Sequence, residues 1–166
     1  YNFFKNKEDF VCQIIARYGK NYLNWIDSFM ADQSISPLKR IQNFYAVMID
    51  LNESDDYQSG CFVNVMSNEI GRTHNAVSEA LNESFNGWMK SISACIREGQ
   101  EVNEIRKDFS PEELSEFLHA GIYGGFARMK VVIQITSSFL LAMAPEPRRV
   151  PTIVTFLSIT VQSFGL

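Results

Sequence analysis

The sequence has few cysteines and histidines, and none of them is spaced to pair or to bind a metal. Cys12, Cys61 and Cys95 are widely separated and form no Cys-x-x-Cys motif, and His74 and His119 lie far apart along the chain. This usage is typical of a reduced, cytoplasmic protein and argues against a disulfide scaffold or a zinc site. We therefore expect neither a metal nor another cofactor.

The chain also lacks a surplus of positive charge. It holds 15 Lys and Arg residues against 19 Asp and Glu residues, which gives a formal net charge of −4 at pH 7. A domain that binds nucleic acid on its own usually presents a basic face to the phosphates. We therefore expect that these 166 residues do not bind DNA by themselves.

No segment has the pattern of a membrane span or of a signal peptide. The longest weakly polar stretch, residues 131–144, is too short to cross a bilayer, and it contains Gln134, Thr136, Ser137 and Ser138. The opening residues lack a basic segment followed by an apolar one. The sequence thus predicts a protein with no membrane partner.

What the chain does contain is apolar residues at helical spacing, and these predict an all-α fold. Hydrophobic residues make up 46% of the chain, enough for one domain with its own core. Asn6 is the expected N-cap of a first helix over 7–31, with the apolar stripe Phe10, Ile14, Tyr18, Tyr22, Trp25 and Phe29. A second helix is predicted to begin at Ser36-Pro37 and to end at the polar run 52–60. A short apolar segment, 61–70, and a long helix, 74–101, follow.

Ser110-Pro111-Glu112-Glu113 is the clearest helix start in the chain. Ser110 and Glu113 can cap each other's backbone, and proline is favoured at the first helical position. Apolar positions continue this helix as far as Met129. After the prolines at 145, 147 and 151, residues 152–161 alternate apolar residues with Ser or Thr and resemble a strand more than a helix.

Four motifs, in their order and spacing, resemble the TetR family of transcriptional regulators. The opening Tyr1-Asn2-Phe3-Phe4-Lys5-Asn6-Lys7-Glu8 is similar to the segment that joins the recognition helix of that family to its regulatory domain. The other three are Ser36-Pro37-Leu38-Lys39-Arg40-Ile41, Gly60-Cys61-Phe62-Val63 with Glu69, and Glu98-Gly99-Gln100 followed by Ile105-Arg106-Lys107-Asp108. The resemblance covers residues 1–130, whereas the tail lacks the amphipathic final helix of the family.

The resemblance implies a helical bundle of the TetR regulatory-domain type. Residues 1–6 would be a remnant of the DNA-binding head and its junction, and residues 7–166 the ligand-binding and dimerisation domain, with 131–166 as an atypical tail. Family members are homodimers whose helix-turn-helix heads bind operator DNA, and this chain lacks that head. We expect a cytoplasmic repressor that a small hydrophobic or electrophilic effector releases from DNA by shifting the helix 7–31.

The resemblance also assigns candidate site residues. Tyr1 and Lys7 match positions that contact DNA phosphates in the family. The ligand-binding candidates are aromatic, polar or sulfur-containing side chains on or beside apolar stripes, although such residues are also typical of an ordinary core. They are Trp25, Tyr45, Met48, Cys61, Asn64, Trp88, His119 and Tyr123. Cys61 stands just before a predicted helix start and would sense electrophiles or oxidants only if its thiol pKa were lowered; the alternative is that it has no redox role.

The dimer interface is expected on the last helices. Gly121, Gly124 and Gly125 each cost a helix about 1 kcal/mol relative to alanine, so their clustering indicates that another backbone packs there. With Phe126, they are the predicted contacts to a second copy of the chain. The alternative is close packing inside one subunit.

Two other functions compete with the regulator. An enzyme could use Cys61 with a histidine as a nucleophile–base pair. The sequence offers no oxyanion-type turn, no phosphate loop and no telling pair of acids beside them, so we expect no enzymatic activity. The remaining alternative is a helical protein-interaction module without a ligand.

Overall fold

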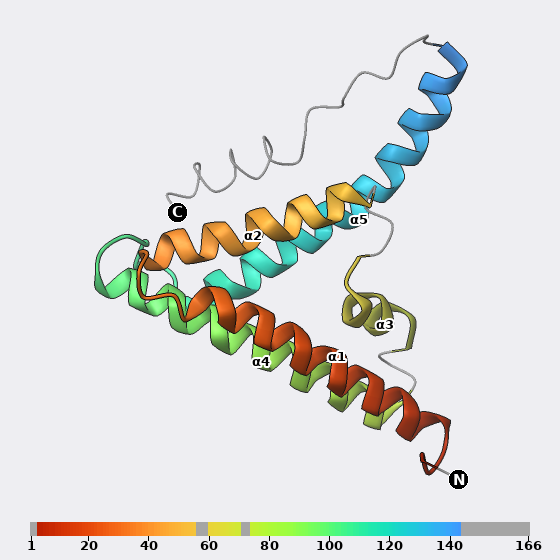
Figure 1. The fold of residues 1–166 in the computed structure, drawn as a ribbon, viewed down its shortest axis with the longest axis horizontal. Helices are drawn as coiled ribbons and strands as arrows, with labels where there is room; N and C mark the ends of the chain where they lie inside the picture. The colour runs from red at the N-terminus through yellow and green to blue at the C-terminus, as the bar shows by residue number, and fades with distance from the viewer. Residues whose placement is uncertain (1–2, 56–59, 71–73, 144–166) are drawn as a thin grey trace.

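The described part of the chain folds into five helices (Figure 1). The computed structural model describes residues 3–55, 60–70 and 74–143, and it contains no strand within these ranges. The helices are α1 (Lys7–Met30), α2 (Pro37–Ser54), α3 (Phe62–Ile70), α4 (Asn75–Glu101) and α5 (Pro111–Met143). The predicted all-α fold class is therefore confirmed, and the first four helices begin and end within three residues of their predicted bounds.

Local hydrogen bonds explain where helices begin. The side chain of Asn6 accepts a 2.8 Å hydrogen bond from the Asp9 N–H at the start of α1. At the start of α5, the Ser110 N–H donates to Glu113 Oε2 (2.8 Å), and the Glu113 N–H donates to Ser110 Oγ (3.2 Å). These bonds satisfy N–H groups that a helix start otherwise leaves without a partner. Both predicted caps are therefore confirmed.

α4 ends in a tight reversal of the backbone. Asn103 adopts a left-handed conformation with a φ of 61°, and the N–H groups of Glu104 and Ile105 donate to the Gly99 carbonyl (2.8 and 3.1 Å). A Cβ atom on Gly99 would lie 2.5 Å from the Ile105 side chain. Glycine is thus needed for Ile105 to pack against the last turn of the helix.

α5 is longer than the apolar pattern of the sequence indicates. That pattern reaches only Met129, whereas the helix continues to Met143 and extends past the other helices in Figure 1. No proline or glycine lies between Gly125 and Pro145, so no residue there interrupts the backbone hydrogen bonds. None of the described helices is both long and apolar enough to cross a bilayer. The strand-like pattern at 152–161 lies outside the described residues.

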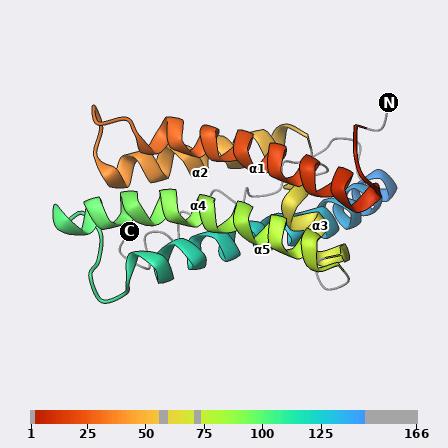
Figure 2. The same ribbon diagram turned by 90° about the horizontal axis from the view of Figure 1, so that it is seen from below.

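The four long helices form two layers. α1 and α2 lie in one layer and α4 and α5 in the other, with α3 near one end (Figure 2). α1 and α4 run side by side, and their backbones approach closely at Gly19, where a Cβ atom would lie 2.2 Å from Ser84 Oγ. Only glycine fits this crossing without a shift of one helix or of the serine.

A buried charge in the core, the single one among the residues whose burial is described, joins three helices. Arg40 is 2% exposed. Its guanidinium donates to the Met30 carbonyl at the end of α1 (2.5 Å) and to the Glu98 carboxylate on α4 (2.6 Å). Arg40 therefore fixes the C-terminal end of α1 against α2 and α4. Large apolar side chains fill the core around it, among them Ile26, Phe44, Trp88, Ile92 and Ile96.

Candidate functional site

A cavity of about 710 Å³ lies between α3, α4 and α5. Its walls combine aromatic, sulfur-containing and carboxamide side chains, a mixture typical of small-molecule sites. Cys61, just before α3, and Asn64 and Asn68 on α3 form one side; α4 contributes Asn82, Phe85, Asn86 and Met89; and α5 contributes His119, Tyr123 and Phe126. Four of the eight predicted ligand-binding residues therefore line one cavity: Cys61, Asn64, His119 and Tyr123.

The other four predicted residues do not line this cavity, and they lie at different depths behind it. Met48 accepts a hydrogen bond at Sδ from the Tyr123 hydroxyl (3.7 Å), so it lies one side chain behind the wall. Trp88 has its ring centroid 6.4 Å from that of His119. Trp25 and Tyr45 pack instead against Phe44, with ring centroids 5.0 Å apart in each case. The sequence pattern could not separate the wall from the core behind it.

Tyrosine hydroxyl groups connect the cavity wall to α1. The Tyr22 and Tyr123 hydroxyl oxygens lie 2.9 Å apart, so one of them donates to the other, and the Tyr22 oxygen also lies 3.0 Å from Met48 Sδ. The Tyr18 hydroxyl donates to Cys61 Sγ at 4.0 Å. Sequence reasoning placed Tyr18 and Tyr22 only in the apolar stripe of the first helix, although a hydroxyl group on such a stripe is the signal that could have found them.

Burial keeps these hydroxyl groups protonated. Desolvation raises the pKa of Tyr18 to about 12 and raises the pKa of Tyr22 and Tyr123 further. Each hydroxyl can therefore donate one hydrogen bond and accept others at physiological pH.

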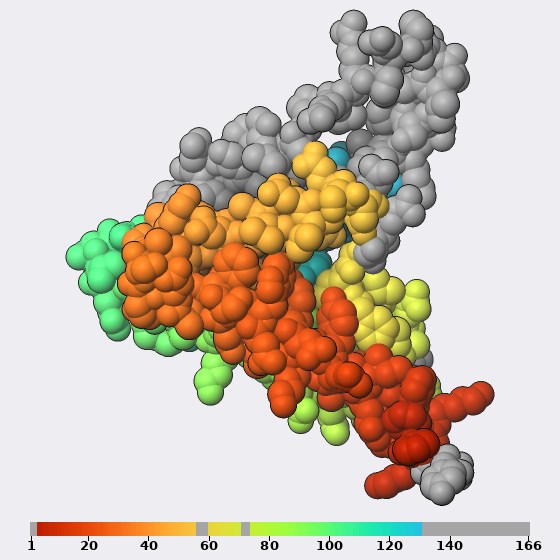
Figure 3. Space-filling model, viewed as in Figure 1, coloured from red at the N-terminus to blue at the C-terminus, as the bar shows by residue number. Residues whose placement is uncertain are grey.

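On the face shown in Figure 3, α1, α2 and α3 leave a gap through which atoms of α5 are visible. The hydroxyl groups of Tyr18 and Tyr22 on α1 and Tyr123 on α5 join these same four segments, because they also contact Met48 on α2 and Cys61 just before α3.

His119 is a neutral side chain in the cavity wall. Burial lowers the pKa of its imidazole to about 4. The ring packs against Tyr123 (centroids 4.4 Å apart) and Phe85 (5.5 Å). Its Nε2 atom and the Nδ2 atom of Asn64 are both buried and have no hydrogen-bond partner in the described part of the protein. A buried polar atom without a partner is uncommon and often marks where a ligand or water binds.

Trp88 lies behind the same wall, against Phe85, and connects it to the backbone of α1. It is 1% exposed, and its indole nitrogen donates a 3.0 Å hydrogen bond to the Gly19 carbonyl oxygen. Its ring also packs against Tyr22, with centroids 4.6 Å apart. Both links from the cavity, through Trp88 and through Tyr123, therefore reach the middle of α1.

Comparison with known proteins identifies the family. Residues 37–137 match the family described as "Tetracyclin repressor-like, C-terminal domain". The chain belongs to this family. It is 34% identical over 131 residues to the HTH-type transcriptional repressor DhaR from Mycobacterium sp. (strain GP1), a match that covers 79% of this chain and 64% of that protein. It is 26% identical over 134 residues to the transcriptional regulator AcuR from Cereibacter sphaeroides, which covers 81% of this chain and 61% of that protein.

The chain thus spans less than two thirds of the length of either curated relative.

Two solved structures share the fold. The regulatory protein TetR from Rhodobacter sphaeroides has a TM-score of 0.74 at 24% identity and matches 99% of this chain and 77% of its own. The reduced form of NemR from E. coli has a TM-score of 0.68 at 18% identity and matches 80% of this chain and 69% of its own. The predicted helical bundle of the TetR regulatory-domain type is therefore confirmed.

Cys61, in the Gly-Cys motif that resembles the TetR family, is buried at 7% exposure. It immediately precedes α3, and its carbonyl accepts from the Val65 N–H (3.0 Å). All three cysteines are free. Burial raises the pKa of the other two thiols, Cys12 and, to about 11, Cys95, so neither is activated as a nucleophile. Within the described ranges, no group of three or more His, Cys, Asp or Glu residues is arranged to hold a metal.

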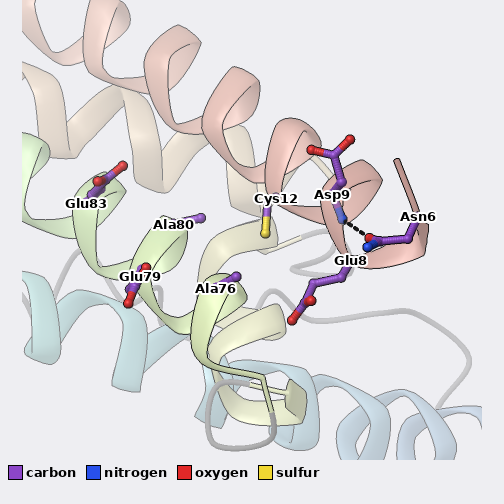
Figure 4. A pocket seen from close by; sticks show the side chains of 8 residues that line it. All are labelled: Asn6, Glu8, Asp9, Cys12, Ala76, Glu79, Ala80 and Glu83. Carbon is purple, nitrogen blue, oxygen red and sulfur yellow. Dashed lines mark hydrogen bonds between the residues drawn. The ribbon is translucent and has the colours of Figure 1, made fainter. Parts of the chain in front are cut away.

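The residues that the TetR resemblance assigns to DNA lie at the start of α1. Lys7 is exposed there, while Tyr1 lies outside the described residues. Beside Lys7, a second hollow of about 330 Å³ separates the starts of α1 and α4 (Figure 4). Four acidic residues line it: Glu8, Asp9, Glu79 and Glu83. Glu8 also pairs with His74 across the helices, at 3.6 Å between Oε1 and Nδ1.

The α5 glycines predicted at the dimer interface have open space beside them. A Cβ atom on Gly121, Gly124 or Gly125 would meet no atom within 4 Å, and Gly121 and Gly124 are exposed. The alternative of close packing inside one subunit is therefore wrong for the part of the chain that the structure describes. Phe126 differs from the glycines, because it is 3% exposed and lines the cavity of its own chain, so it offers no free surface to a partner.

Proposed function

We propose that this chain is the effector-binding and dimerisation part of a DNA-binding transcriptional repressor, and that a small molecule in the α3–α4–α5 cavity releases the protein from its operator. The observation that carries the proposal is the pair of links from the cavity wall to α1, through Trp88 and Gly19 and through Tyr123 and Tyr22. The names of the two curated relatives, a repressor and a transcriptional regulator, support the DNA-binding role.

In this proposal α1 is the element that moves. A helix-turn-helix head outside this chain binds the operator, residues 1–6 form its junction, and Tyr1 and Lys7 contact phosphates. Residues 7–166 bind the effector and a second copy of the chain, with 131–166 as the atypical tail. A ligand can shift α1 only if it binds the DNA-free arrangement more tightly, and such coupling is typically worth about 1–3 kcal/mol.

The effector is a small hydrophobic or electrophilic compound. The aromatic wall around His119 supports the first class, and the position of Cys61 in the same cavity supports the second. An electrophile would form a bond to Cys61 Sγ, and the thiol proton would leave to solvent or to the product. No general base is paired with that thiol in the described residues, which supports a regulator rather than an enzyme.

The homodimer forms through α5. The exposed position of Gly121 supports this, because a small residue lets two helices approach closely and nothing in the described chain occupies the space; Gly124 is exposed too but lines the cavity. Replacing Gly121 with leucine should weaken self-association in sedimentation measurements. The control, Ala16→Leu on the exposed side of α1, should not. The protein acts in the cytoplasm and needs no cofactor.

The test uses the full-length protein and a pool of random duplex DNA. The full-length protein should select a palindrome, and the 166-residue chain alone should select none. A small-molecule library is then screened for release of that palindrome. A compound that releases wild-type protein should fail on Ala120→Phe, which fills the cavity, and should still act on the control Ala46→Phe on the exposed side of α2.

Three results would contradict the proposal. Failure of the full-length protein to select any DNA would exclude the repressor. Release that is unchanged in the Ala120→Phe variant would place the effector elsewhere, and the absence of any releasing compound would favour a helical interaction module without a ligand.

A further inference from the structure

The α3–α4–α5 cavity has four carboxamide groups in its wall, of which Asn64 is partly buried and Asn68, Asn82 and Asn86 are exposed. Asn64 and Asn68 are four residues apart on α3, and Asn82 and Asn86 are four residues apart on α4, so each pair lies on one face of its helix. None of the four side chains makes a hydrogen bond to another described residue, and the Nδ2 atom of Asn64 is buried. Leaving a buried N–H donor without an acceptor is costly, so the site is built to receive one.

The middle of the cavity carries no charge. Its two ionised residues, Glu116 and Lys130, are fourteen positions apart on α5, which is about 21 Å along a helix. Between them α5 presents His119, which is neutral because burial lowers its pKa to about 4. An ionic ligand seated in the middle would lose its hydration without gaining an opposite charge. The middle of the cavity therefore favours an uncharged ligand.

Ring systems form the wall next to Asn64. The rings of Phe85 and His119 meet edge to face, with centroids 5.5 Å apart, and the His119 and Tyr123 centroids are 4.4 Å apart. The thioether of Met89 lies on the same wall. Aromatic rings and thioethers both pack well against the faces and edges of a flat apolar ring.

From these three features we propose that the cavity binds an uncharged ring compound bearing a carbonyl group, with its ring against Phe85 and His119 and its carbonyl oxygen accepting from Asn64 Nδ2. The role of this ligand as the effector rests on the proposed function. The inference itself concerns only which compounds the cavity binds. Asn82 and Asn86, on α4 beside Phe85, would accept hydrogen bonds from further polar atoms of a larger ligand or donate hydrogen bonds to them.

The test compares three probes that share one carbon skeleton: 1-indanone, indane and indane-1-carboxylate. Their dissociation constants are measured with the full-length protein by ligand-observed NMR. We expect 1-indanone to bind at least tenfold more tightly than either of the others. The Asn64→Leu variant should lose this preference, so that all three probes bind with about the same dissociation constant. The control variant Asn24→Leu should keep the preference, because Asn24 lies on the exposed side of α1 and outside the cavity.

A second measurement needs no variant. The carbonyl stretch of bound 1-indanone should lie at lower wavenumber than in hexane, because a hydrogen bond from an amide N–H weakens the C=O bond. Circular dichroism melts confirm that both variants are folded before their affinities are compared.

Each contrary result overturns the inference. Tighter binding of indane-1-carboxylate would show that Lys130 and not Asn64 selects the ligand, and equal binding of indane would show a purely apolar site. No binding of any probe, or a ketone preference that survives in Asn64→Leu, also contradicts it. Because none of these measurements involves DNA, failure here leaves the repressor proposal standing, and failure of DNA selection leaves the ketone preference standing.

Discussion

The indole nitrogen of Trp88 donates a 3.0 Å hydrogen bond to the carbonyl oxygen of Gly19, and this bond joins the cavity side of α4 to the backbone of α1. The two residues are 69 positions apart in the sequence. Ring contacts with Tyr22 and Phe85 fix the indole in place, at centroid distances of 4.6 and 5.4 Å. The interhelical bond is therefore part of the core and not a surface contact.

Replacing Trp88 with phenylalanine should lower the free energy of unfolding by about 1–3 kcal/mol, because a buried hydrogen bond and part of a buried ring are lost. The measurement is urea unfolding followed by circular dichroism. Trp25→Phe is the matched control: Trp25 is only half-buried, and its indole nitrogen donates no hydrogen bond within the described residues. Equal losses for the two variants would contradict a special role for the Trp88 bond.

Alanine substitutions at two glycines should have effects of opposite sign. At Gly19 a new Cβ atom would lie 2.2 Å from Ser84 Oγ, so Gly19→Ala should destabilise the protein by about 1–3 kcal/mol. At Gly121 nothing lies within 4 Å, and Gly121→Ala should stabilise the helix by about 0.5–1 kcal/mol. Thermal melts at low protein concentration report both changes. Adding Ser84→Gly should relieve the Gly19→Ala defect, and a defect that persists in the double variant would argue against this steric cause.

Breaking the buried ion pair of Arg40 should be costly. Arg40 is 2% exposed and holds both the Met30 carbonyl and the Glu98 carboxylate. Glu98 is 45% exposed, so water screens part of the pair, but Arg40→Ala should still destabilise the protein by about 3 kcal/mol. In chemical denaturation, the control Arg97→Ala should cause no measurable change, since Arg97 and Glu112 are both more than half exposed. Similar losses in the two variants would contradict a structural role for the Arg40 contacts.

Acidification should destabilise the fold through His119. Burial lowers the pKa of this imidazole from 6.5 to about 4 in the folded state. The unfolded chain therefore binds more protons between these two values, and stability falls as the pH falls through that window. From pH 7 to pH 5 the loss attributable to His119 is about 2 kcal/mol. Denaturant unfolding of the wild type and of His119→Phe at both pH values measures this contribution as the difference between their stability losses. An equal loss of stability in both proteins would exclude His119 as the cause.

Most of the helix boundaries could be predicted from the sequence because their causes are local. The N-cap at Asn6 and the reciprocal cap of Ser110 and Glu113 each involve residues three apart. The exception is the end of α5. Val131, Val132 and Ile133 favour strands in isolation, but nothing between Gly125 and Pro145 stops a helix that has already begun.

The site was predicted only in part because its decisive contacts join distant residues. The periodic pattern marked Asn64, His119 and Tyr123 as polar groups near apolar stripes. It could not show that Tyr22 meets Tyr123 across 101 positions, or that Tyr18 meets Cys61 across 43. Asn82 and Asn86 were missed for a different reason: both are exposed polar residues beside the stripe of a helix, and only the packing of α3 near α4 makes them part of a cavity wall.

The position of Gly19 along α1 has a geometric consequence. Twelve residues separate it from Lys7, which is about 18 Å of helix. Because Arg40 fixes the far end of α1 and Trp88 fixes its middle, the near end is the part with freedom to tilt, and the hollow beneath it offers room. A tilt of about 5° around Gly19 would displace Lys7 by about 1.6 Å at this helical rise. A rearrangement too small to disturb the core would thus change the distance between the two Lys7 side chains of the proposed dimer.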